Sequence, residues 1–222
     1  ANNTGIGYFA LAANTTGASN TAIGKDAMIA NTTGTGNVAV GIDALQANTT
    51  AGTNTAVGKD AMYSNTTGYG VALGKGALYS NTTGSGNTAV GYQSLEDNTT
   101  ASNNTALGDS ALGANTTGGQ NVAVGEGAGN SNTTGTSICA LGRQALEANT
   151  TGSNNTALGE RALFANTTGD GSVALGSNAL NANTTGTSNT AVGQQANKVT
   201  TTGVNCTMIG SLSRSSGVDV NN

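Results

Sequence analysis

The sequence has no proline, histidine or tryptophan, and only 8% of its 222 residues are charged. Without histidine it lacks the commonest general base, and two scattered cysteines do not assemble the usual pairs of nucleophile and base. Carboxylates are not clustered at the spacing that a calcium loop needs. We therefore predict no catalytic residue, no cofactor and no metal, and we expect that the protein is not an enzyme.

Positive charge is also scarce. The seven Lys and Arg residues are outnumbered by eleven Asp and Glu residues, which gives a formal net charge of −4. Nucleic-acid binding needs clustered Lys and Arg, so we expect no nucleic-acid partner. No run of residues is long and apolar enough to cross a bilayer, so we also expect no membrane insertion.

The two cysteines, Cys139 and Cys206, lie about four repeats apart in the pattern described next. If the repeats stack at strand spacing, their Cα atoms are roughly 20 Å apart. A disulfide requires less than about 7 Å. We therefore expect two free thiols.

Glycine, asparagine, threonine and alanine are in excess, and they are arranged in a repeat. The tetrad Asn-Thr-Thr-(Gly/Ala) recurs every 17 residues, except for one interval of 16 between Asn65 and Asn81. The consensus is NTTGxxNTAVGxxALxx, and thirteen copies of its TAVG element run from Thr4 to Gly210. Helical hairpin repeats need more than 30 residues, and Gly, Asn and Thr are poor helix formers.

We therefore predict an all-β fold, a parallel β-solenoid (β-roll) of about 13 coils with a 17-residue repeat over residues 1–210. Residues 211–222 lose the repeat, and we interpret them as a C-terminal cap or a junction to a missing domain. Both ends of the sequence look like junctions within a longer protein.

The TAVG element alternates as a strand does, and the copy around Val40 illustrates our expectations. Val40 belongs to a column that is always Ile, Val or Leu, so we expect it to face inward together with Val38, while Ala39 faces outward. Gly41 recurs in all thirteen copies. It indicates either a corner with positive φ or the close approach of a neighbouring chain. A second apolar column, at Leu45, is expected in a short second strand.

A solenoid with these columns has a thin core. Burying two large aliphatic side chains per 17 residues offsets only a small part of the conformational entropy that a coil loses when it folds. Stacked Asn and Thr side chains can bond along the stack and add stability. The Ala and Gly column is small and uncharged, so we expect such faces of several copies to pack together and predict a homo-oligomer.

The segment NTAVGYQSLEDNTT (Asn87–Thr100) resembles the repeats of bacteriophage and bacterial tail-fibre proteins. Its (T/V)-A-(I/V/L)-G core is similar to the head repeats of YadA-type trimeric autotransporter adhesins. The resemblance implies a left-handed β-roll that trimerises. It also implies an extracellular location, as the shaft or head of a virion fibre or bacterial surface adhesin. Such a rod would serve host or surface attachment, with a cell-surface receptor or glycan as the partner.

Three aromatic residues follow the second apolar column and are expected to point outward: Tyr63, Tyr79 and Phe164. Tyr63 and Tyr79 fall on consecutive coils, so their rings could stack. We interpret the three residues as contacts at a subunit interface or at the surface, with a receptor contact as the alternative.

The tetrad threonines support a second functional hypothesis. If one threonine of each pair faces outward, the coils present a regular, uncharged array similar to that of ice-binding solenoids. The first four complete pairs are Thr15, Thr16, Thr32, Thr33, Thr49, Thr50, Thr66 and Thr67. Two observations oppose this hypothesis: the threonine of TAVG is expected to be buried, and the 16-residue coil is expected to interrupt the array.

Asn-x-Thr in each tetrad also matches the glycosylation sequon. Asparagine tolerates left-handed backbone and bonds its own backbone in turns. We therefore interpret the tetrad asparagine as a turn residue rather than a glycan acceptor.

Overall fold

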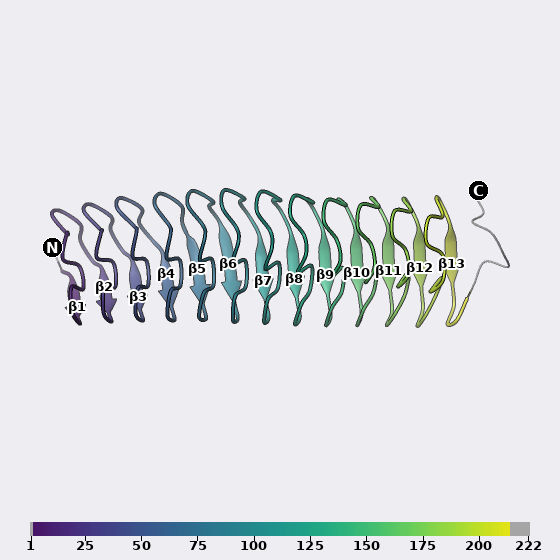
Figure 1. The fold of residues 1–222 in the computed structure, drawn as a ribbon, viewed down its shortest axis with the longest axis horizontal. Helices are drawn as coiled ribbons and strands as arrows, with labels where there is room; N and C mark the ends of the chain where they lie inside the picture. The colour runs from purple at the N-terminus through teal and green to yellow at the C-terminus, as the bar shows by residue number, and fades with distance from the viewer. Residues whose placement is uncertain (1, 214–222) are drawn as a thin grey trace. The chain divides into compact units, whose positions relative to one another are not determined.

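The computed structural model describes residues 2–213, and each repeat in it contributes one short parallel β-strand (Figure 1). The strands follow one another in chain order. Their bounds are β1 (Thr4–Ile6), β2 (Thr21–Ile23), β3 (Val38–Val40), β4 (Thr55–Val57), β5 (Gly70–Leu73), β6 (Asn87–Val90), β7 (Thr105–Leu107), β8 (Val122–Val124), β9 (Cys139–Leu141), β10 (Thr156–Leu158), β11 (Val173–Leu175), β12 (Thr190–Val192) and β13 (Thr207–Ile209).

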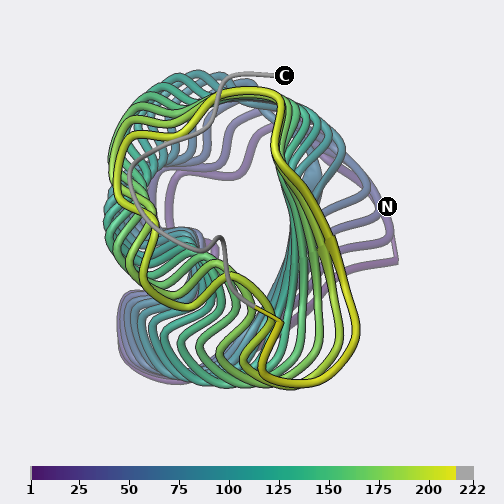
Figure 2. The same cartoon turned by 90° about the vertical axis from the view of Figure 1, so that its right-hand side faces the viewer.

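The chain forms two compact units, Ala1–Asp109 with β1–β7 and Ser110–Asn222 with β8–β13. In the first unit Val40 of β3 pairs with Val57 of β4, one repeat later. The second unit keeps the same register from β8 to β13, and in the end-on view successive coils follow similar paths, each slightly offset from the one before (Figure 2). The predicted parallel β-solenoid with a 17-residue repeat is confirmed.

No helix occurs among the described residues, and in that part of the chain nothing helical is long and apolar enough to cross a membrane. Of the predicted C-terminal segment 211–222, residues 214–222 lie outside the described part.

The facing predicted for the strands is wrong. Ala39 is 0% exposed, whereas its neighbours Val38 and Val40 are half-buried on the outer surface. The same holds in the second unit, where Ala157 is 0% exposed and Leu158 is 47% exposed. The physical reason is space: the interior beside the strand is filled by the Leu and Met column and by asparagines, so only a methyl group fits.

The predicted second strand through the Ala-Leu pair is also wrong. These residues lie in turns, and Leu163 has a φ of 51°. The left-handed backbone costs about 1–2 kcal/mol for such a residue. The buried side chain, 0% exposed, offsets this because burying a leucine contributes about 1.5–3 kcal/mol.

Two columns of asparagine fill much of the remaining interior. We call Asn31 and its equivalents the tetrad asparagines, and Asn37 and its equivalents the strand asparagines. Asn31 Nδ2 donates to Asn14 Oδ1 (2.9 Å) in the preceding coil and to the carbonyl of Gly34 (3.2 Å). The same carbonyl accepts from Asn20 Nδ2 (2.8 Å), and Asn20 Oδ1 accepts from the backbone N–H of Asn37 (2.9 Å). Side-chain amides therefore link successive coils inside the stack.

The glycine after each strand has a positive φ, and after β1–β6 and β8–β12 it also lies close to a neighbour, which is the next coil of the same chain and not another chain. Gly142 has a φ of 131°, and a Cβ there would lie 2.7 Å from the carbonyl oxygen of Gly159. In the first unit Gly58 has a φ of 135°, and a Cβ would lie 2.5 Å from the oxygen of Gly74. A side chain at this position would push two coils apart.

The coil that is one residue short keeps the register. Gly70 stands where other coils have a strand asparagine, and its N–H donates to Asn54 Oδ1 at 2.9 Å. Thr55 still pairs with Val71 in the sheet. The expectation that this coil interrupts the array is therefore wrong, because the shortening is taken up in the loop before the strand.

Candidate functional surfaces

Two outward columns of the strands form a continuous surface in each unit, which we call the apolar strip. None of its members is buried, and none is charged. One column is Thr4, Thr21, Val38, Thr55, Val71, Thr88, Thr105, Val122, Cys139, Thr156, Val173, Thr190 and Thr207. The other is Ile6, Ile23, Val40, Val57, Leu73, Val90, Leu107, Val124, Leu141, Leu158, Leu175, Val192 and Ile209.

Large side chains in the strip are well exposed. Leu73 is 47% and Leu107 46% exposed in the first unit, and Leu158 is 47% exposed in the second. Each strand places two such side chains on the same face, because the alanine between them points inward. Contiguous apolar surface of this kind is rare on isolated soluble proteins and marks interaction sites.

Cys139 lies half-buried in the strip, whereas Cys206 is 4% exposed in the interior column of strand asparagines. Neither forms a disulfide, as predicted. The half-buried Cys139 occupies the same column as threonine and valine, which have a similar volume.

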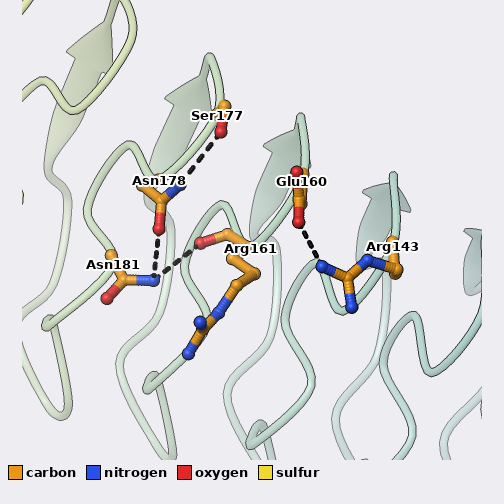
Figure 3. A network of polar contacts seen from close by, with 6 residues as sticks. All are labelled: Arg143, Glu160, Arg161, Ser177, Asn178 and Asn181. Atoms are coloured by element: carbon orange, nitrogen blue, oxygen red, sulfur yellow. Dashed lines mark hydrogen bonds and ion pairs between the residues drawn. The ribbon is translucent and has the colours of Figure 1, made fainter.

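Most of the charged residues lie at the corner that follows the strands. Lys25 pairs with Asp26 at 2.5 Å and Lys59 with Asp60 at 3.2 Å. In the second unit Arg143 pairs with Glu160 of the next coil (Figure 3).

The hydrogen bond that Arg143 donates to Glu160, and then the negative charge of Glu160, raise the pKa of the Arg143 guanidinium. Asp26 raises the pKa of Lys25 in the same way. The Arg143 and Glu160 side chains are 51% and 48% exposed, so water screens the interaction between them. The corner is a solvated ridge that contributes little to stability.

Polar contacts continue along the same corner in the next coils (Figure 3). Asn181 Nδ2 donates to the carbonyl of Arg161 at 3.1 Å, and Asn178 Nδ2 donates to Ser177 Oγ at 2.9 Å. Asn178 and Asn181 are therefore bonded within the chain, whereas the buried Nε of Arg161 has no hydrogen-bond partner among the described residues.

Each of the three predicted aromatic contacts has one ring face against a neighbouring side chain, and Tyr79 is still 36% exposed. Tyr63 and Tyr79 stack with ring centroids 5.0 Å apart and planes 9° apart, so each gives one ring face to the other. The Arg161 guanidinium lies 4.1 Å from the centroid of Phe164. A sugar ring stacks on an open aromatic face, so this arrangement offers limited support for a glycan contact at these three residues.

The structure separates the two threonines of each tetrad. Thr32, the first of its pair, donates its hydroxyl to the carbonyl of Thr49 at 3.1 Å and is half-buried. Thr33, the second, is exposed. Thr15, Thr66, Thr150 and Thr167 bond as Thr32 does, and Thr16, Thr50, Thr67, Thr151 and Thr168 are exposed as Thr33 is.

The tetrad asparagines are not available to a glycan. Asn31, Asn48 and Asn149 are each 0% exposed, and their amides donate to the preceding asparagine. An N-linked sugar would remove that donor and would have no room. The tetrad asparagine bonds a backbone carbonyl three residues on, as turn chemistry predicts, but its φ is not positive.

Residues 2–213 contain no group of three or more His, Cys, Asp or Glu side chains that could hold a metal ion. The two surfaces that remain as candidate interaction sites are the apolar strip and the exposed threonines.

Sequence reasoning missed the apolar strip because it placed these side chains inside. A signal was present: the middle strand position is alanine in eleven of thirteen copies, whereas the flanking columns vary in size. A uniformly small column is typical of a tight interior, and variation is typical of a surface.

Comparisons with protein-family models, with curated proteins and with solved structures found no significant match to this chain.

Proposed function

We propose that this chain is a structural and adhesive segment, a shaft or head, of a homotrimeric extracellular fibre. The observation that carries the proposal is the apolar strip. It is exposed on the single chain, it contains no charge, and it recurs on every strand of both units. Burying such a strip against identical strips of two further copies would supply the apolar burial that the thin interior lacks.

Identical copies of the chain are the binding partners that fit the apolar strip. Because it carries no Lys, Arg, Asp or Glu, copies meet without like-charge repulsion. Its side chains recur at the coil repeat, so a parallel copy in register matches it at every rung. The charged corner, with pairs such as Arg143 and Glu160, then remains in water and keeps the assembly soluble.

The number of three copies and the left-handed winding come from the resemblance to YadA-type heads and tail-fibre repeats. The same resemblance suggests a virion fibre or a bacterial cell surface as the location and attachment to a host or surface as the role. A cell-surface receptor or glycan would be the partner of the complete fibre.

The test is the solution mass of the purified chain and of one strip variant. Sedimentation equilibrium should give three times the 21.4 kDa chain mass for the unmodified protein. Leu158→Asp places a charge in the strip and should give the monomer mass with an unchanged β-sheet circular dichroism spectrum. Glu126→Tyr is the matched control, because its corner column holds tyrosine naturally at Tyr8 and Tyr92, and it should remain trimeric. A monomeric unmodified chain at micromolar concentration would overturn the proposal.

A further inference from the structure

The second threonine of the tetrad is the least variable exposed residue of the coil. It is threonine in all twelve tetrads, and it is exposed in every one of them. By contrast, the exposed residue after the strand glycine is Tyr, Lys, Ile, Asp, Glu, Arg, Ser or Gln. The coil's own packing tolerates change at an exposed position, so uniformity there indicates a requirement set from outside the chain.

Five hydroxyls of this column, in five consecutive coils of the second unit, are not used in bonds within the described part of the chain. Thr117, Thr134, Thr151, Thr168 and Thr185, which we call the threonine column, form no side-chain hydrogen bond with the described residues. The first threonines are different, because Thr133 and Thr150 donate their hydroxyls to the carbonyls of the next coil at 3.0 Å. A structural hydrogen bond therefore explains one threonine of each pair and leaves the other unexplained.

The backbone holds the threonine column at a fixed spacing. The N–H of Thr134 donates to the carbonyl of Thr150 at 3.1 Å, and that of Thr151 to Thr167 at 3.2 Å. Successive hydroxyls therefore repeat at the rise of the stack, about 4.8 Å. The branched side chain also has few rotamers, so hydroxyl and methyl positions repeat with little disorder.

The surroundings of the threonine column are small and mostly uncharged. The residue two positions before each first threonine is Ala or Ser in five consecutive coils: Ala114, Ser131, Ala148, Ala165 and Ala182. None of these side chains can protrude beyond the threonine. Asp170 is the charged residue nearest in sequence, and its carboxylate accepts from the Ser153 N–H at 2.6 Å.

We infer that the threonine column of the second unit binds the surface of ice. Equally spaced hydroxyls with adjacent methyl groups can hold water at a repeat close to that of oxygen atoms along one axis of the ice lattice. A crystal face also requires a constant spacing, which the backbone hydrogen bonds between coils provide, and small neighbours, which the Ala and Ser residues before each pair provide. The apolar strip lacks this regularity, because Val, Leu and Ile alternate irregularly along it.

This inference is independent of the proposed trimer. The threonine column lies six residues before the strand's central alanine in each coil, outside the apolar strip. One fibre can carry both surfaces, and an experiment can reject either proposal without rejecting the other.

The test is ice growth in the presence of the purified chain. The unmodified protein should facet ice crystals and produce a thermal hysteresis gap, and the triple variant Thr134→Tyr, Thr151→Tyr and Thr168→Tyr should lose both. Glu126→Tyr is the matched control, since it adds the same ring at an exposed position elsewhere, and it should keep full activity. Circular dichroism and sedimentation should show that all three proteins have the same fold and chain count.

Two outcomes would overturn the inference. The first is that ice grows in a solution of the unmodified protein in the same way as in buffer alone. Binding of the protein to insoluble chitin or cellulose, without an effect on ice growth, would count as the same outcome. The second is an unchanged hysteresis gap in the triple tyrosine variant.

Discussion

The side chain of Ile138 occupies the space that Gly129 leaves empty in the interior of the second unit. A Cβ built on Gly129 would lie 3.5 Å from Cδ1 of Ile138 and 3.1 Å from Cδ2 of Leu112. Gly129 stands in the Leu and Met column, and Ile138, 1% exposed, stands in the column of strand asparagines. The small residue Gly129 and the large residue Ile138 therefore compensate for each other in volume where two successive coils meet.

Restoring the repeat at one of these positions alone should destabilise the chain. Gly129→Leu overpacks the site and should cost about 1–3 kcal/mol, and Ile138→Asn leaves a cavity that should cost about 2–5 kcal/mol. The double variant recreates the ordinary coil, so its loss should be smaller than the sum by about 0.5–3 kcal/mol. Urea unfolding of the four proteins measures this coupling, and strictly additive losses would show that the two side chains do not share the space.

The asparagine column should be sensitive to charge in a pH-dependent way. Asn149 is 0% exposed and donates to Asn132 Oδ1 at 2.7 Å and to the Gly152 carbonyl at 2.9 Å. In Asn149→Asp the carboxylate cannot donate, and burial among acceptors raises its folded pKa above the unfolded value of about 3.9. The variant should therefore be least destabilised below pH 4 and lose stability as pH rises through the folded pKa.

Thermal unfolding of Asn149→Asp relative to the unmodified chain, between pH 3 and pH 7, checks this direction. Asn154→Asp is the control, because Asn154 is exposed, and its difference from the unmodified chain should stay nearly constant. A buried variant that grew more stable toward pH 7 would contradict the asparagine column as described.

Two leucines of one coil should behave differently because they lie on opposite sides of the backbone. Leu163 is 0% exposed, so Leu163→Ala should lower the free energy of unfolding by about 2–5 kcal/mol at every protein concentration. Leu158 is 47% exposed, so Leu158→Ala should act through assembly, with a loss that depends on concentration. Denaturation at two concentrations separates them, and a large concentration-independent loss for Leu158→Ala would place that side chain inside.

The glycine after the strand should not accept even a methyl group. Gly142→Ala brings a Cβ to 2.7 Å from the backbone of Gly159 at a φ of 131°, so we expect a lower unfolding temperature and slower refolding. Gly127 has a φ of 64°, and Asp26, Asp43 and Asp60 in the same column have φ values of 55°, 58° and 60°. A Cβ at Gly127 meets nothing closer than 3.7 Å. Gly127→Asn should therefore be tolerated, and equal losses in both variants would contradict the close approach of coils.

The period of the sequence was sufficient to predict the stack of parallel strands. Val40 and Val57 pair because identical residues recur every 17 positions, and the absence of a disulfide between Cys139 and Cys206 follows from the same geometry. The facing of the strands was not predictable from alternation, because a period of two fits either face equally well. The uniformly small size of the alanine column, rather than its hydrophobicity, indicated that this column faces the interior.

The left-handed leucines could not be predicted from propensity. An L-residue such as Leu163 rarely adopts φ near 51°, so the Ala-Leu pair was interpreted as a strand. The one indication in the sequence is substitution within the column, where Gly129 and Asn197 replace leucine. Glycine and asparagine are the residues that adopt left-handed backbone most readily.

The central claim is that the apolar strip faces other copies and the threonine column faces away from them. Electron paramagnetic resonance on spin-labelled chains in a Cys139→Ser, Cys206→Ser background measures this directly. A label at Ser177→Cys, beside the strip, should give a short distance between copies, and a label at Thr168→Cys should give a distinctly longer one. A shorter distance at position 168 than at position 177, or no coupling between copies at either position, would contradict the account.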